Sequence, residues 1–162
     1  MASLKQLIEA LCKGKVQFVI IGGMATVAQG VTYVTVDLDI CYERSAQNCE
    51  RIADTLAPFQ PYLRDAPPGL PFVLDAATIQ VGLNFTLSTT AGDLDLIGEV
   101  AGLGAYDSVL ANSEPLELFG LTCSVLTLEG LLKAKRASGR PRDLLLIPEL
   151  EALLALRRKA EA

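Results

Sequence analysis

The feature that most constrains the fold is an apolar run, residues 16–21, that ends directly in Gly22-Gly23. Its valine, isoleucine and phenylalanine residues are typical of a buried strand. The two glycines favour a sharp turn, after which a short helix is expected over residues 24–29. No charge occurs from Val16 to Val36, a length that could span a bilayer. The glycines, glutamines and threonines inside this stretch favour strand and turn, so no membrane segment is expected.

The rest of the chain predicts a mixed sheet with helices on either side of it. Strands are expected over residues 34–42, 72–74, 79–87 and 94–97, and a hairpin over residues 116–125 that turns at Gly120. Helices are expected over residues 3–13, 45–57 and 127–138 and from Pro141 onward, with Pro148 as a possible kink. Residues 58–71 contain five of the eight prolines and are expected to form a loop.

This order of elements indicates an α/β or α+β fold with a mixed β-sheet. The sequence shows no internal repeat and no linker between domains. We therefore expect a single domain over residues 1–162, with a core of about 16–126 and a helical C-terminal part, 127–162.

Composition excludes several classes of function. The chain of 162 residues has no histidine, which removes histidine-based triads, histidine general bases and histidine-containing zinc sites. Its net charge of −5 argues against extended binding of duplex nucleic acid, because that affinity comes largely from neutralised phosphates. The four cysteines lack metal-ligand spacing and follow no signal-peptide pattern, so buried thiols in a reducing cytoplasm are expected.

Two aspartates alternate with apolar residues in the strand expected over residues 34–42. Asp37 and Asp39 point to one face of that strand, roughly 6.5–7 Å apart along the chain, while Leu38 and Ile40 point to the core. Paired carboxylates repel each other unless a cation lies between them, and Mg²⁺ prefers carboxylate oxygens, water and substrate phosphates. The pattern therefore predicts a metal site, next to a glycine turn and helix start that favour phosphate.

A third carboxylate is expected from the later strand over residues 94–97. We favour Asp95, which lies inside that strand between two leucines, over Asp93 at its edge. Each feature also has a plain structural explanation, because alternating acids are common on the solvated face of a sheet and Gly-Gly alone is a turn. The order of strand, Gly-Gly, helix and acidic strand is more specific than any of its parts.

Gly22-Gly23 followed by Asp37-x-Asp39 resembles the nucleotidyltransferase superfamily, the group related to DNA polymerase beta. The chain looks most similar to the small bacterial members that include the toxin components of AbiE-type toxin–antitoxin systems. Residues 135–143 resemble the lysine, arginine and Arg-Asp block of that group. The resemblance covers about residues 18–153 and implies the nucleotidyltransferase fold, a mixed sheet flanked by helices with further helices at the C-terminus.

The resemblance implies a metal-dependent enzyme that moves a nucleoside monophosphate from an NTP to an acceptor hydroxyl and releases pyrophosphate. Asp37 and Asp39 would bind Mg²⁺ or Mn²⁺, and Asp95 would bridge the metal and deprotonate the acceptor. The acceptor stays open between RNA, a protein and a small molecule, and a cognate antitoxin is the partner that a toxin would require.

The resemblance also implies a substrate-binding set. Gly22 and Gly23 would let the backbone approach the triphosphate. Lys135 and Arg140 would balance the phosphate charge, and Asp143 would fix one of these two cations by a charge-assisted hydrogen bond.

Three positions depart from the family pattern. The group often has His-Gly where this chain has Gln29-Gly30, an arginine where it has Tyr33, and a second aspartate where it has Leu146. Two alternatives to an active enzyme therefore stay open. One is a degenerate member that binds a nucleotide or a partner without turnover, and the other is an α/β scaffold whose acids are merely solvated.

Overall fold

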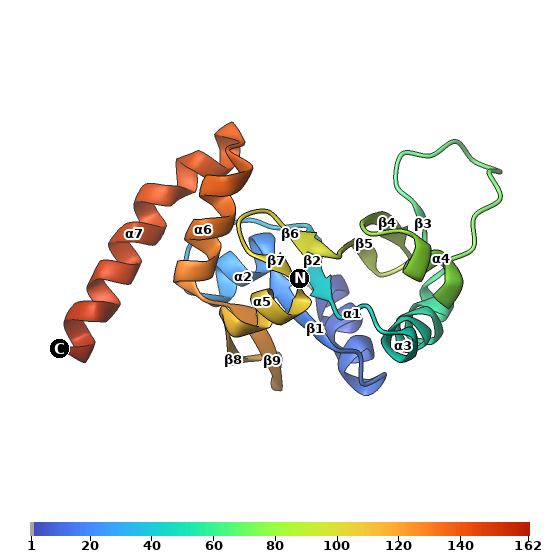
Figure 1. Ribbon diagram of the computed structural model, residues 1–162, viewed down its shortest axis with the longest axis horizontal. Coiled ribbons are helices and arrows are strands. Elements are labelled where there is room, and N and C mark those ends of the chain that lie inside the picture. The colour runs from blue at the N-terminus through green and yellow to red at the C-terminus, as the bar shows by residue number, and fades with distance from the viewer. Residues whose placement is uncertain (1) are drawn as a thin grey trace.

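A seven-stranded mixed sheet forms the centre of the protein in the computed structural model, which describes residues 2–162 (Figure 1). The strand order is β3-β4-β5-β2-β1-β9-β8, and β6 and β7 form a separate pair. The strands are β1 (Phe18–Ile21), β2 (Asp37–Tyr42), β3 (Tyr62–Leu63), β4 (Phe85–Thr89), β5 (Gly92–Ile97), β6 (Glu99–Val100), β7 (Gly104–Ala105), β8 (Ser113–Leu118) and β9 (Leu121–Leu126).

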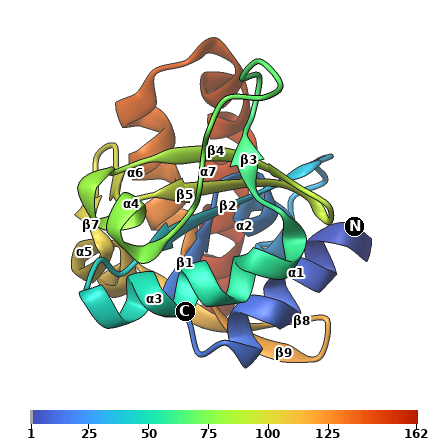
Figure 2. The same cartoon turned by 90° about the vertical axis from the view of Figure 1, so that its right-hand side faces the viewer.

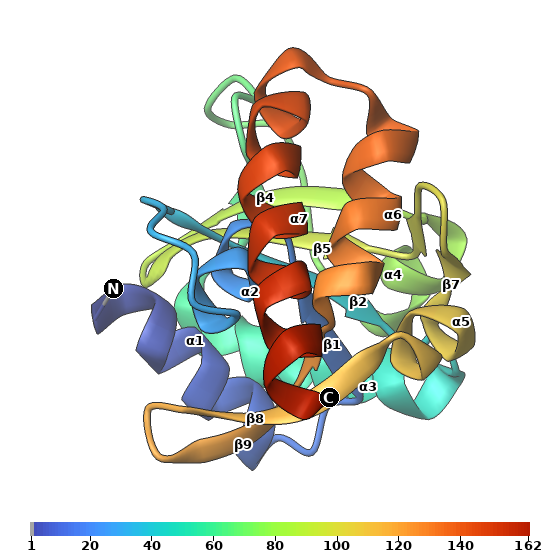
Figure 3. The same cartoon turned by 90° about the vertical axis from the view of Figure 1, so that its left-hand side faces the viewer.

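Helices cover both faces of this sheet, so the predicted class of a mixed sheet flanked by helices is confirmed. They are α1 (Ala2–Lys13), α2 (Gly22–Ala28), α3 (Ala46–Leu56), α4 (Ala76–Val81), α5 (Tyr106–Ala111), α6 (Leu128–Ser138) and α7 (Pro141–Glu161), with a 3₁₀ turn at Ala57–Phe59. Helices α1 and α3 lie together on one side (Figure 2), and α2, α6 and α7 lie on the other (Figure 3).

Two of the three central strands, β2 and β5, carry the acidic pattern. Strand β1 is buried throughout and pairs antiparallel with β2, which in turn pairs parallel with β5. In the β2–β5 register Leu38 lies beside Leu94, and both side chains are fully buried. The aspartates on either side of these two leucines point to the opposite face of the sheet, where their side chains are half-exposed. The predicted alternation of acids and core residues is therefore present in both strands.

Two of the predicted strands differ from the structure. Residues 72–74 form irregular loop, and residues 79–81 belong to helix α4, so that β4 begins only at Phe85. Helix α4 starts because the Asp75 carboxylate accepts a hydrogen bond from the Thr78 amide at 2.8 Å. That cap outweighs the strand preference of the β-branched residues that follow it.

Other elements were not expected from the sequence. The proline-rich segment contains the short edge strand β3, and helix α5 follows the glycine-rich loop. Conversely, regular pairing of β2 begins at Asp37, so residues 34–36 are irregular rather than strand.

Helix α6 begins and ends at the predicted residues, and α7 begins at Pro141 as predicted. Thr127 caps α6 by accepting a hydrogen bond from the Gly130 amide, and Gly139 ends it in the left-handed conformation. Helix α7 continues through Pro148. Near its end, Arg157 donates to the side chain of buried Gln29 at 2.7 Å, which ties α7 to the end of α2.

The cysteines are free thiols, as predicted, although Cys12 is only half-buried while the other three are buried. Cys12 lies 4.0 Å from Cys123, sulfur to sulfur. Within the described residues, none of the helices combines the length and the apolar character needed to cross a bilayer.

Candidate active site

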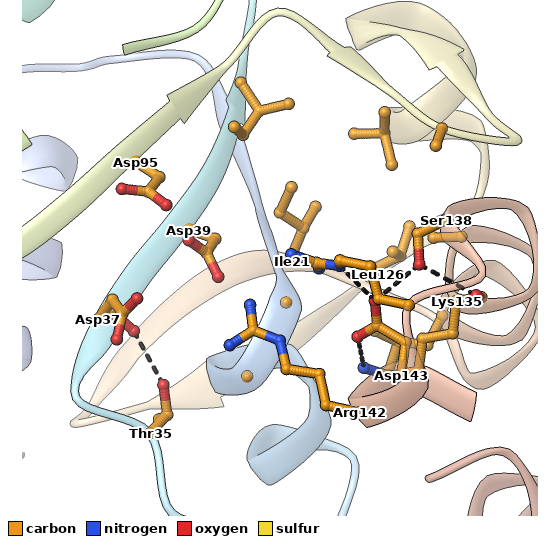
Figure 4. Close-up of a pocket in the computed structure, with 18 of the residues that line it drawn as sticks. Ile21, Thr35, Asp37, Asp39, Asp95, Leu126, Lys135, Ser138, Arg142 and Asp143 are labelled. Carbon is orange, nitrogen blue, oxygen red and sulfur yellow. Dashed lines mark hydrogen bonds and ion pairs between the residues drawn. The ribbon is translucent and has the colours of Figure 1, made fainter. Parts of the chain in front are cut away.

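Three carboxylates meet on the half-exposed face of the central sheet. Asp37 and Asp39 come from β2 and Asp95 from β5, where the register places Asp39 directly beside Asp95. One carboxylate oxygen from each residue lies within 4.8 Å of the others, and the three side chains point into a common space (Figure 4). The structure therefore brings together the three acids singled out by the sequence.

Burial and repulsion within this cluster change the acidity of Asp39. Its pKa is raised from 3.8 to about 7, first by burial, then by the charge and hydrogen bonding of Asp95 and the charge of Asp37, against an opposing effect of Arg64. A divalent cation would replace the retained proton and neutralise the remaining charges. A set of three carboxylate oxygens is also the donor chemistry that Mg²⁺ and Mn²⁺ prefer. The residues present thus fit a divalent metal ion.

Helix α2 begins at Gly22, two residues before the predicted start, and its two glycines leave room for the acids. Gly22 has a φ of +64°, and a Cβ atom on it would lie 2.2 Å from an oxygen of Asp39. A Cβ on Gly23 would lie 2.7 Å from the hydroxyl of Thr35, whose Oγ1 donates to the carbonyl of Asp37. Both glycines line the cavity beside the acids. The structure therefore adds a second reason for Gly22, namely the close approach of Asp39.

A buried carboxylate organises the cations on the other side of the cavity. Asp143 accepts from the Ser138 hydroxyl at 2.6 Å and from Arg140 Nε at 2.7 Å, and Lys135 Nζ lies 3.5 Å from its other oxygen. Burial alone would raise the pKa of Asp143, but these hydrogen bonds and the charge of Lys135 lower it below its usual value. Asp143 therefore contacts both of the cations named from the sequence.

The anion that compensates Lys135 is thus a neighbouring side chain. Lys135 is only 10% exposed and lies on the border of the apolar stripe of α6. Buried ammonium groups require a negative partner, and Asp143 is that partner here. Lys135 and Arg140 still line the cavity, but each already forms an ion pair.

Arg142 is a cation that sequence reasoning did not assign to the site. It is the second residue of α7 and lines the cavity, and its guanidinium points toward the side of the cavity that holds the three acids (Figure 4). Among residues 2–162 it forms no ion pair. Its place beside Asp143 in the Arg-Asp pair was the signal that could have identified it.

Arg64 was also missed, because it lies in the proline-rich segment expected to be a loop. Its Nη2 donates to Asp95 Oδ1 at 2.7 Å. The contact joins the acid cluster to the edge of the sheet, and no short-range pattern in the sequence indicates it.

The acids and cations line opposite sides of one cavity of about 430 Å³. Apolar residues complete its walls. They come from the irregular segment before β2, with Tyr33, Val34 and Val36, and from the segment 97–101. Val34 and Val36 are 87% and 73% exposed, so an apolar surface borders the charged centre. The cavity can therefore accept a ligand that has both anionic and apolar parts.

The fold of the chain is similar to that of a solved structure over nearly the whole chain. TM1012 from Thermotoga maritima, named a nucleotidyltransferase, superposes with a TM-score of 0.53 at 16% identity, covering 98% of this chain and 90% of that one. The protein has the nucleotidyltransferase fold. The sequence by itself matches no family model and no curated protein.

Two further structures with the nucleotidyltransferase fold are similar to this chain. The lincosamide antibiotic adenylyltransferase LnuA, solved with lincomycin bound, has a TM-score of 0.59 at 14% identity and covers 93% of this chain and 96% of its own. ANT(2")-Ia, solved with adenylyl-2"-tobramycin, has a TM-score of 0.55 at 13% identity and covers 98% and 97%. At these identities the likeness concerns the fold.

Substituting Gly22 tests the packing of the start of α2 against Asp39. Gly22→Ala should destabilise the protein and abolish stabilisation by Mn²⁺, because the methyl group would displace the Asp39 carboxylate as well as strain the backbone. Gly120→Ala is the matched control, since Gly120 also has a positive φ, of +77°, but no other atom lies within 4 Å of the place that its methyl group would take. Thermal melts of both variants with and without Mn²⁺ measure the difference. Retained Mn²⁺ stabilisation in Gly22→Ala would contradict the proposed packing.

The raised pKa of Asp39 predicts a pH dependence of stability. Between about pH 4 and pH 7 the folded state keeps a proton that the unfolded state has lost, so in EDTA the free energy of unfolding should fall as pH rises through this window. Above about pH 7 this contribution should be constant. Chemical denaturation over this range and just beyond it measures the slope. Asp39→Asn should flatten the slope, and an equal slope in that variant would assign it to other groups.

Proposed function

We propose that the protein is a metal-dependent nucleotidyltransferase that transfers a nucleoside monophosphate from an NTP to an acceptor hydroxyl. The observation that carries this proposal is the meeting of Asp37, Asp39 and Asp95 across one cavity from a cationic helix start, in a chain with the nucleotidyltransferase fold. Acids alone would suit any divalent metal site. Acids opposite cations suit a metal and a polyphosphate together.

Asp37, Asp39 and Asp95 would hold Mg²⁺ or Mn²⁺. When bound, such an ion neutralises charge on the phosphate oxygens and on the leaving pyrophosphate. Asp95, on the neighbouring strand, is the carboxylate that we assign to the acceptor. It would take the proton of the hydroxyl while the acceptor oxygen forms its bond to the α-phosphorus and the bond from that phosphorus to the pyrophosphate oxygen breaks.

The opposite wall would bind the triphosphate. Arg142 supplies a guanidinium that can pair with phosphate, in the first turn of a 21-residue helix whose dipole favours negative charge. Lys135 and Arg140 add positive charge, and Asp143 holds both in place. Gly22 and Gly23 place no side chain beside the acids, so the phosphates would be able to approach the backbone there.

A small hydroxyl-bearing molecule is the acceptor that we favour. LnuA was solved with lincomycin and ANT(2")-Ia with an adenylylated tobramycin, and both share this fold over more than nine-tenths of the chain. The resemblance to toxin components supports a second class of acceptor, RNA or a protein, together with a cognate antitoxin. Either reaction consumes an NTP, so we place the protein in the cytoplasm.

Metal and nucleotide together should stabilise the folded protein. A ligand that binds only the folded state at a hundredfold excess over its Kd stabilises it by about 2.7 kcal/mol, which raises Tm measurably. Asp37→Asn combined with Asp39→Asn should abolish this rise and leave the ligand-free protein as stable as wild type or more so, because it relieves like-charge repulsion. Equal stabilisation of the double variant would locate the site elsewhere.

Labelled NTPs then separate the enzyme from a binding module. Each NTP is incubated with Mg²⁺ or Mn²⁺ and with hydroxyl-bearing small molecules, total RNA or lysate protein, and release of pyrophosphate is followed. Binding without turnover on any acceptor would favour the degenerate member of the fold family.

Arg142 should contribute to NTP affinity more than a nearby surface lysine. Arg142→Ala is expected to weaken binding of a non-hydrolysable NTP with Mg²⁺ at least tenfold, about 1.4 kcal/mol, because its guanidinium faces the site. Lys133→Ala removes the same charge from the exposed side of α6 and should change affinity less than twofold at moderate salt. Calorimetric titration measures both. Equal affinities would mean that residues 140–143 are only a charged surface.

A further inference from the structure

Arg64 reaches the acid cluster from the edge of the sheet. It follows strand β3, and its backbone amide donates to the carbonyl of Thr86 at 2.9 Å, which continues the pairing of β3 with β4. Strand β4 separates β3 from β5 in the sheet. The side chain must therefore extend across β4 to reach the acids of β5, and only 19% of it is exposed.

The guanidinium is held at defined points. Nη2 donates both to the carbonyl of Leu87 at 2.8 Å and to Asp95 Oδ1 at 2.7 Å. Nε is buried and lies 3.3 Å from an oxygen of Asp93, without hydrogen-bond geometry. Asp93 is 41% exposed and Asp95 only 20%, so the shorter and more enclosed ion pair is the one with Asp95.

The hydrogen bond from Arg64 restricts the side-chain rotation of Asp95, which the backbone of β5 does not. An aspartate side chain rotates about χ1 and χ2, so the position of Asp95 on β5 does not decide which carboxylate oxygen faces the cluster. A charge-assisted hydrogen bond to one oxygen opposes that rotation and leaves the other oxygen available. The Leu87 carbonyl fixes the guanidinium, so the donor itself does not follow the carboxylate.

We propose that Arg64 is the positioning residue of Asp95. It holds one oxygen of Asp95 so that the other stays directed toward the acceptor hydroxyl. This role rests on the proposed function, in which Asp95 takes the proton of that hydroxyl. We do not assign Arg64 to the phosphates, because it is not among the residues that line the cavity and its Nη2 already donates twice.

The test compares Arg64→Met with Arg64→Lys and with a matched control. Arg44→Met is that control, because Arg44 also donates from Nη2 to two backbone carbonyls, of Gln80 and Gly82, but forms no ion pair with an acid among the described residues. Two quantities are measured for each variant: kcat and KM for NTP turnover, and the Kd for Mn²⁺ in the absence of nucleotide.

Arg64→Met should lower kcat at least thirtyfold and change KM for the NTP less than threefold. The same variant should bind Mn²⁺ at least threefold more tightly, because the Asp95 carboxylate is no longer neutralised by its ion pair with the guanidinium. Arg64→Lys keeps the charge, so it should restore the Mn²⁺ affinity and part of kcat. Arg44→Met should leave both within twofold of wild type. Opposite changes in turnover and in metal affinity would not follow from a loss of folding.

Two results would overturn the proposal. One is a kcat for Arg64→Met within twofold of wild type, and the other is a parallel loss of kcat and of Mn²⁺ affinity, which would mean that Arg64 only supports the fold. A third arm does not depend on turnover: in an Asp95→Asn background, Arg64→Met should change the Mn²⁺ affinity less than twofold. An equal change in both backgrounds would show that Arg64 does not act through Asp95.

The test also separates this proposal from the proposed function. If the wild type binds Mn²⁺ but turns over no NTP, the proposed function is wrong. The Mn²⁺ affinities in the two backgrounds would still decide whether Arg64 acts through Asp95.

Discussion

Repulsion among three neighbouring carboxylates is the constraint on which the site depends. The parallel register of β2 and β5 places Asp39 beside Asp95, while Leu38 and Leu94 pack into the core from the opposite face. A slip of one residue would bury the acids and expose the leucines, so the hydrophobic core holds the acids together against their own repulsion. Together with burial, this repulsion raises the pKa of Asp39. Because a bound cation would relieve this repulsion, the site favours the binding of a cation.

Positively charged side chains lie near this cluster on two sides, one already paired with an acid and one not. Arg64 comes from the sheet itself and pairs with Asp95, whereas the start of α7 lies across the cavity and presents Arg142. The position of α7 depends on contacts far from its start, including an ion pair between Arg136 and Glu151 and the hydrogen bonds from Arg157 to Gln29. The cationic wall is therefore positioned by the packing of the whole C-terminal helix.

Local patterns predicted the parts of the structure that local forces determine. The buried strand before Gly22, the cap at Thr127 and the stop at Gly139 depend on neighbouring residues only, and the structure has them at those positions. Residues 79–81 were predicted as strand because of their β-branched side chains, but the Asp75 cap made them helix. The edge strand β3 was missed because two residues of strand among prolines leave no periodic signal.

The sequence by itself determined the alternation of acids with apolar residues, the glycine pair that follows the buried strand and the cationic block of residues 135–142, since each is a property of residues close together in the chain. Only the tertiary structure decided which groups meet. It placed Asp95 beside Asp39 from a distant part of the sequence, brought Arg64 over β4 to Asp95, and gave Lys135 the carboxylate of Asp143 as its partner. Strand order and helix packing depend on the total apolar surface that is buried throughout the chain, and no short sequence pattern predicts that total.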